Sequence, residues 1–173
     1  MLIFCYGSNM CRERFEQRIP SSRYITSACL DSHQLKFHKK SIDGSAKADA
    51  YYTGRVEDKV WGVVNKIDPK QKVLLDEYEG LGVGYDHKEV EVGDVEGKKY
   101  KTWVYFAIKI GKNLKPYKWY KEFVLAGALQ HGLPPSYIKK IATMPHHLDK
   151  NRQRANFNQR IIGVERARLS GFF

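Results

Sequence analysis

The order of strand-like and helix-like segments is the feature that most constrains the fold of this chain. Stretches rich in β-branched and aromatic residues fill its first two thirds, and helical patterns dominate its last third. A turn at 94–97 joins two of the strand-like stretches into a predicted hairpin. Strands that precede helices, instead of alternating with them, predict an α+β fold, a small mixed or antiparallel β-barrel with flanking helices. The strand-like stretches span 2–6, 24–38, 46–56, 60–64, 88–92 and 99–108, and the helical patterns span 10–15, 69–79, 117–130 and 134–143.

The length of 173 residues fits a single domain with its own hydrophobic core. No apolar run approaches the roughly 18 residues that a membrane span needs, and the first residues lack the pattern of a signal peptide. We therefore expect a cytoplasmic protein without a membrane partner. Three cysteines, Cys5, Cys11 and Cys29, form neither a disulfide framework nor a CxxC pair, so we interpret them as reduced thiols.

The net charge of +11 raises the question of an anionic partner. The basic excess is spread along the chain, although it is densest between Lys150 and Phe173, where Glu165 is the only acid. No helix-turn-helix, zinc-finger or RNA-recognition signature accompanies it. We interpret the charge as a solvated basic surface and do not expect nucleic acid as a partner.

The helical pattern at 69–79 ends in three carboxylates, although the dipole of a helix favours cations at that end. With residues spaced 100° apart, Leu74, Leu75 and Tyr78 form an apolar face, and Glu79 falls about 40° from Leu75. Burial and the dipole would both disfavour the charged form of this carboxylate, which makes Glu79 a candidate general base. The alternative is a helix-end glutamate that reaches solvent or pairs with a lysine.

A second unusual feature is the break of the first strand-like run at Tyr6-Gly7-Ser8-Asn9. A strand that turns at a glycine into a helix can aim successive backbone N–H groups at a carboxylate or phosphate. The alternative is an ordinary turn in which Ser8 or Asn9 caps the helix predicted at 10–15.

Three motifs in register resemble those of γ-glutamylcyclotransferases. The resemblance extends over about 2–137, and together the motifs are specific although each alone is modest. Their family patterns are YGSN, VWGVV…LDxxEG and Y…GA…GLP. In this chain the matching residues are FCYGSNM at 4–10, VWGVV at 60–64 with LDEYEG at 75–80, and Tyr120 with Gly127-Ala128 and HGLP at 131–134.

The resemblance implies a reaction. Members of that family let the α-amine of a γ-glutamyl group attack its own γ-carbonyl, which releases 5-oxoproline and a free amino acid or amine without a metal or cofactor. By matching positions, Glu79 would be the acid/base, and Tyr120 would contribute a hydroxyl. Tyr85 and Tyr105 align with further pocket tyrosines, after a loop that is one residue shorter here. The glutamyl group would be held, mainly through backbone groups, by Ile3, Phe4, Cys5, Tyr6, Gly7, Ser8 and Asn9.

We assign 1–145 to a γ-glutamylcyclotransferase-like domain and 146–173 to a basic C-terminal extension of the same domain. The expected partner is a small-molecule γ-glutamyl substrate, and a homodimer is a further expectation. We predict no metal at His146 and His147, because adjacent histidines seldom share an ion without a third ligand. Two alternatives remain open. One is a related cyclotransferase that acts on a γ-glutamyl amide of a specialised metabolite, and the other is a non-catalytic pocket protein whose basic tail binds an anionic partner.

Overall fold

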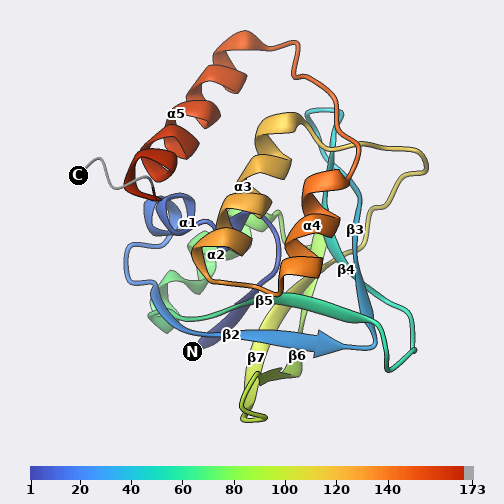
Figure 1. Ribbon diagram of the computed structural model, residues 1–173, viewed down its shortest axis with the longest axis vertical. Coiled ribbons are helices and arrows are strands. Elements are labelled where there is room, and N and C mark those ends of the chain that lie inside the picture. Colours follow the sequence, from blue (N-terminus) through green and yellow to red (C-terminus); the bar gives the residue numbers. More distant parts are fainter. Residues whose placement is uncertain (170–173) are drawn as a thin grey trace.

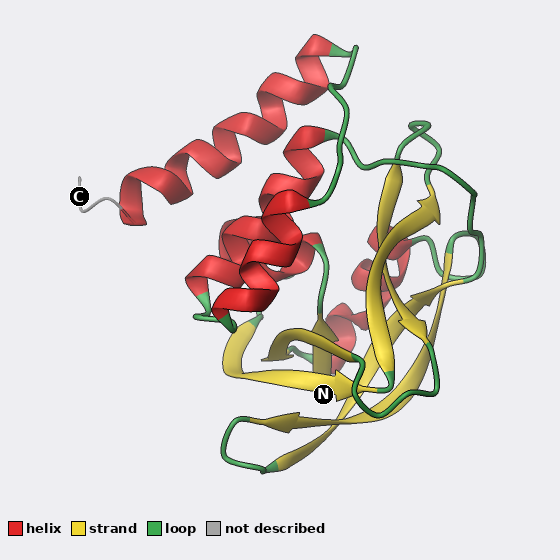
Figure 2. Ribbon diagram, turned by 45° about the vertical axis from the view of Figure 1, so that its right-hand side comes forward, coloured by secondary structure: helices red, strands yellow, loops and turns green. Residues whose placement is uncertain are grey.

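Five strands close into a barrel, which lies below helices α3, α4 and α5 in Figures 1 and 2. The structure, a computed structural model, describes the backbone of residues 1–169 and the side chains of residues 1–162. All neighbouring pairs are antiparallel except β1 and β7, which are parallel, so the barrel is mixed and the predicted α+β class is confirmed. The barrel strands, in order, are β1 (Leu2–Cys5), β5 (Lys59–Lys66), β2 (Arg23–Asp31), β6 (Tyr85–Asp94) and β7 (Lys99–Ala107).

The first strand, β1, is almost fully buried between β5 and β7. Gly62 in β5 makes this close packing possible. A Cβ atom at that position would lie 2.4 Å from the backbone oxygen of Cys5 and 2.8 Å from the ring of Phe4. The glycine of the VWGVV motif is therefore required by the close approach of the two strands.

A two-stranded sheet, β3 (His33–Lys40) and β4 (Ala46–Tyr52), stands beside the barrel. The prediction of one strand over 24–38 is wrong at this point. Ser32 has a φ of 60°, which turns the chain out of the barrel after β2 and starts a second sheet. The strand predicted at 46–56 ends at Tyr52, because Gly54, with a φ of 73°, turns the chain back toward β5.

Helices α3, α4 and α5 gather on one side of the strands (Figure 1). Gly127 lets α3 approach the turn after β1, because a Cβ atom there would lie 2.4 Å from Cβ of Met10. No helix within residues 1–169 has the length and apolar character to cross a membrane. The helices are η1 (Ser8–Met10), α1 (Arg12–Arg18), η2 (Pro69–Gln71), α2 (Lys72–Glu79), α3 (Lys118–Gln130), α4 (Pro135–Thr143) and α5 (Arg152–Leu169).

The start and stop signals of the middle helices are confirmed. The Asp68 side chain accepts a hydrogen bond from the backbone of Lys70, and Gly80 ends α2 with a φ of 67°. The helix predicted at 10–15 begins later, at Arg12, after the short 3-10 helix η1. Ser8 and Asn9 do not cap it, because Cys11 occupies its N-cap position. The Ser8 hydroxyl accepts from Arg14, and the Asn9 amide donates to Glu79.

Candidate active site

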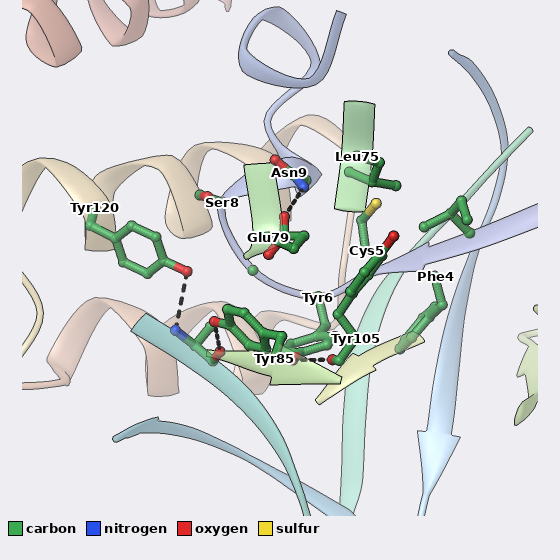
Figure 3. A pocket seen from close by; sticks show the side chains of 13 residues that line it. Phe4, Cys5, Tyr6, Ser8, Asn9, Leu75, Glu79, Tyr85, Tyr105 and Tyr120 are labelled. Atoms are coloured by element: carbon green, nitrogen blue, oxygen red, sulfur yellow. Dashed lines mark hydrogen bonds between the residues drawn. The ribbon is translucent and has the colours of Figure 1, made fainter. Parts of the chain in front are cut away.

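A cavity opens where the end of β1, the end of α2 and the side of α3 meet (Figure 3). Every residue that the sequence predicted for the site lines it. Two further lining residues, Ala48 of β4 and Leu75 of α2, were not predicted as site residues. The predicted lining residues are Ile3, Phe4, Cys5, Tyr6, Gly7, Ser8, Asn9, Glu79, Tyr85, Tyr105 and Tyr120.

The turn at Gly7 forms one wall of the cavity. A Cβ atom on Gly7 would lie 3.2 Å from Cβ of Ala48 and 3.3 Å from the hydroxyl of Tyr120, so a side chain would crowd this wall. The backbone N–H of Met10 donates to the Gly7 oxygen and closes η1. The N–H groups of Ser8 and Asn9, in the first turn of η1, have no acceptor within that short helix.

Glu79, the last residue of α2, brings a carboxylate to this wall. Its side chain is 17% exposed, and Asn9 Nδ2 donates to Oε1 at 2.7 Å (Figure 3). Glu79 and Leu75 both line the cavity, which agrees with the prediction that they lie on the same side of the helix. The predicted apolar face is otherwise wrong, because Leu74 is 42% and Tyr78 53% exposed and only Leu75 is buried.

Two arginines of α1 support the turn, and the sequence analysis did not find them. Arg18 Nη1 donates to Asn9 Oδ1 at 3.0 Å and lies 3.8 Å from Glu79 Oε1. Arg14 Nε donates to the Ser8 hydroxyl at 3.2 Å, and its guanidinium lies 4.5 Å from the ring centroid of Phe123. Burial, followed by the neighbouring Arg18, lowers the pKa of Arg14 to about 9, so Arg14 is still a cation at neutral pH.

Three of the pocket tyrosines use their hydroxyls to hold the walls together. Tyr6 donates to the backbone oxygen of Tyr105 at 2.6 Å, and Tyr85 donates to that of Ala48 at 2.5 Å. Tyr105 donates to the Asp76 carboxylate of α2 at 2.5 Å. Burial raises the pKa of all three hydroxyls above the ordinary tyrosine value, so they remain donors.

Tyr120 differs from these three, because its oxygen accepts from the backbone N–H of Ala48 at 3.1 Å. Its own proton therefore remains for donation to a ligand. Burial also raises the pKa of this hydroxyl. Among the predicted tyrosines, Tyr120 is the one whose contacts leave it best suited to donate into the cavity.

None of the three cysteines forms a disulfide within the described chain, and all are buried. Cys5 lines the cavity, and burial raises the pKa of its thiol to about 12. A thiol with this pKa is protonated at neutral pH and does not provide the thiolate that nucleophilic catalysis requires.

The C-terminal helix α5 contacts the site indirectly. Its buried Asn158 accepts from Nη1 of Arg14 at 3.2 Å, and Ile161 and Ile162 join the hydrophobic core. The basic residue Arg154 is already paired with Asp149, to which its Nε donates at 2.6 Å. Arg166 and Arg168, which belong to the predicted basic C-terminal extension, lie outside the described side chains.

The adjacent histidines of the chain are exposed, and His147 contacts the ring of Tyr117. Within the described residues, no group of three or more His, Cys, Asp and Glu side chains is arranged to hold a metal ion.

Known proteins resemble this chain in sequence and in fold. The AIG2-like family matches residues 59–141, a segment that contains Glu79 and Tyr120. The gamma-glutamylcyclotransferases of Homo sapiens and Bos taurus are each 32% identical to this chain over 148 residues, or 81% of this chain and 76% of the relative. A solved structure of a gamma-glutamyl cyclotransferase has a TM-score of 0.82 at 28% identity, and the match covers 92% of this chain and 98% of that one.

Proposed function

The chain belongs to the γ-glutamylcyclotransferase family of enzymes, and on that premise we propose that it cyclises γ-glutamyl compounds to 5-oxoproline with Glu79 as general acid and base. The proposal rests above all on one observation, the hydrogen bond that joins the Glu79 carboxylate to Asn9 of the glycine turn at one wall of the cavity. A carboxylate beside a set of anion-binding N–H groups suits a substrate that carries both an ammonium and a carboxylate.

The turn after β1 would hold the carboxylate of the glutamyl group or the oxyanion that develops on its γ-carbonyl. The N–H groups of Ser8 and Asn9 are free of acceptors within η1 and can donate to such an anion. Arg14, hydrogen bonded to Ser8, places a positive charge behind the same turn. Tyr120, whose hydroxyl lies next to Gly7, would add a neutral donor.

The reaction requires a proton carrier and no protein nucleophile. The substrate's own α-amine attacks its γ-carbonyl carbon, so the new C–N bond forms within one molecule as the old amide C–N bond breaks. The attacking nitrogen starts as an ammonium and ends as a lactam N–H, so it gives up two protons. The leaving nitrogen gains two and departs as an ammonium. Glu79 would carry these protons one after the other, first as base and then as acid.

Glu79 is better placed than the other carboxylates of α2 to carry these protons. Its carboxylate is largely removed from solvent and fixed by Asn9, so its free oxygen can face a bound ammonium. The other carboxylates of α2 are engaged or directed elsewhere, because Asp76 binds Lys72 and Tyr105, and Glu77 is exposed.

The proposal is tested with γ-glutamyl amino acids, γ-glutamyl amines and one matched compound whose α-amine is acetylated. Mass spectrometry follows 5-oxoproline, glutamate and the released amine. We expect equal amounts of 5-oxoproline and amine from the free-amine compounds, and no product from the acetylated compound, because its nitrogen cannot attack. Release of glutamate would show hydrolysis and contradict the proposal, as would the absence of product from all substrates.

A further inference from the structure

Several cations surround the cavity, and Lys39 of β3 differs from the others in its partners. Arg14 and Arg18 are hydrogen bonded as described above, and Lys47 donates to the Asp43 carboxylate at 2.7 Å. Within the described part of the chain, Nζ of Lys39 has no carboxylate at ion-pair distance. Among the described residues, its Nζ contacts the ring of Tyr85 and donates no hydrogen bond to another protein atom.

The position of Lys39 is defined by two residues at the edge of the cavity. Nζ lies 4.6 Å from the ring centroid of Tyr85, which lines the cavity. A Cβ atom on Gly84 would lie 2.5 Å from Cε and 2.6 Å from Nζ of Lys39, so the glycine provides the space that this side chain occupies. The ammonium is half-buried and lies within the electrostatic field of Glu79.

We propose that Lys39 is a specificity-determining residue that binds a carboxylate on the leaving half of the substrate, so that γ-glutamyl amino acids are favoured over γ-glutamyl amines. This inference rests on the proposed function. It concerns the group that leaves, whereas the turn at Gly7 and Glu79 act on the glutamyl half.

The chemistry of the leaving half supports this assignment. In a γ-glutamyl amino acid, the second carboxylate is attached to the carbon next to the leaving nitrogen. Glu79 must reach that nitrogen to protonate it, and both Glu79 and Tyr85 line the cavity, so a cation that contacts Tyr85 is suited to bind this carboxylate. Burial lowers the pKa of Lys39, which reflects the cost of a half-buried ammonium without a counterion, and an incoming carboxylate would offset that cost. A γ-glutamyl amine supplies no such partner.

The test compares γ-glutamylalanine with γ-glutamylalaninamide, in which a neutral carboxamide of similar shape replaces the carboxylate of the leaving half. The ratio of their kcat/KM values is measured for the wild type, Lys39→Met, Lys39→Arg and Lys40→Met. Lys40 is the exposed next residue of β3, so its variant removes the same charge away from the cavity. We expect Lys39→Met to lower the ratio about tenfold, Lys39→Arg to restore much of it and Lys40→Met to keep it.

Dissociation constants for both ligands are measured in parallel by calorimetry. The two proteins compared are the Glu79→Gln variant and the double variant that carries Glu79→Gln and Lys39→Met. The loss of preference in binding supports Lys39 even if turnover fails, which separates this inference from the proposed function. Equal effects of Lys39→Met on both ligands, or an effect of Lys40→Met as large as that of Lys39→Met, overturns it. The absence of binding by both ligands overturns the inference and the proposed function together.

Discussion

Asn9 Nδ2 donates to Glu79 Oε1 at 2.7 Å and so joins the turn after β1 to the last residue of α2. The same asparagine accepts from Arg18 through Oδ1. An amide between a carboxylate and a guanidinium has a fixed orientation, because its nitrogen must face the acceptor and its oxygen the donor. Asn9 therefore fixes which Glu79 oxygen remains available to a ligand.

Replacing Asn9 is expected to impair turnover more than binding. Asn9→Ala removes a hydrogen bond to a charged group, for which about 1.5–3 kcal/mol is typical, and kcat should fall about tenfold to a hundredfold. Asn9→Asp should be worse, because it places a second carboxylate against Glu79. Steady-state kinetics checks both variants, and wild-type kcat in Asn9→Ala would show that the amide does not position the carboxylate.

The two hydroxyls of Tyr120 and Tyr105 are expected to differ in their roles. Tyr120→Phe should lower kcat/KM about tenfold, because its proton is the one left for a ligand, and it should also lower the free energy of unfolding by about 1–3 kcal/mol, because the buried N–H of Ala48 loses its acceptor. Tyr105→Phe should chiefly lower the free energy of unfolding, by about 1–3 kcal/mol, because it removes the donor to Asp76. Urea unfolding together with kinetics separates the two effects, and a larger loss of kcat/KM in Tyr105→Phe than in Tyr120→Phe would contradict this assignment.

Cys5 is expected to be inert although it lines the cavity. Burial raises the pKa of its thiol to about 12, so the reactive thiolate stays scarce until the pH approaches that value. Activity should survive iodoacetamide at pH 8, and Cys5→Ser should retain activity within a few-fold. Peptide mass spectrometry locates any alkylation. Rapid inactivation that coincides with labelling of Cys5 would contradict the account.

The C-terminal helix is expected to support the pocket through Asn158. Asn158→Ala leaves Arg14 without one of its partners, so the turn at Ser8 should be held less firmly and KM should rise several-fold. The unfolding midpoint should fall by about 2–8 °C. Gln159→Ala is the matched control, because this neighbouring residue is exposed and bonds Glu122 on α3. Equal KM values in the two variants would show that α5 does not support the pocket through Asn158.

Much of the pocket could be predicted from sequence because it depends on local rules and on family motifs. The break at Gly7 and the stop of α2 at Gly80 are signals that a few adjacent residues carry. The direction of Glu79 follows from helix geometry, since Leu75 is one turn earlier on the same face. The glycines at 62 and 127 are explained only by the close approaches that the structure reveals.

The remaining site residues could not be predicted, because their roles depend on contacts between distant segments. In the sequence, Arg14 and Arg18 resemble ordinary surface cations of a helix. Their contacts with Ser8 and Glu79 arise only because α1 packs beside η1 and α2. Lys39 belongs to a basic run that suggests a solvated strand end, and its position follows from Gly84 and Tyr85. The turn between β2 and β3 could not be predicted either, because its left-handed residue is Ser32 and not a glycine.

The central claim is that one carboxylate carries the protons of the cyclisation, and the pair Glu79→Gln and Glu77→Gln tests it most directly. Glu77 lies on the same helix and is exposed, so its variant makes the same chemical change outside the cavity. The measurement is 5-oxoproline formation under single-turnover conditions, with the dissociation constant of the same γ-glutamyl ligand determined by calorimetry.

We expect Glu79→Gln to lose at least a hundredfold in rate while its dissociation constant changes little, because glutamine keeps the shape and cannot carry a proton. Glu77→Gln should behave as the wild type. A Glu79→Gln protein that turns over at the wild-type rate would contradict the account.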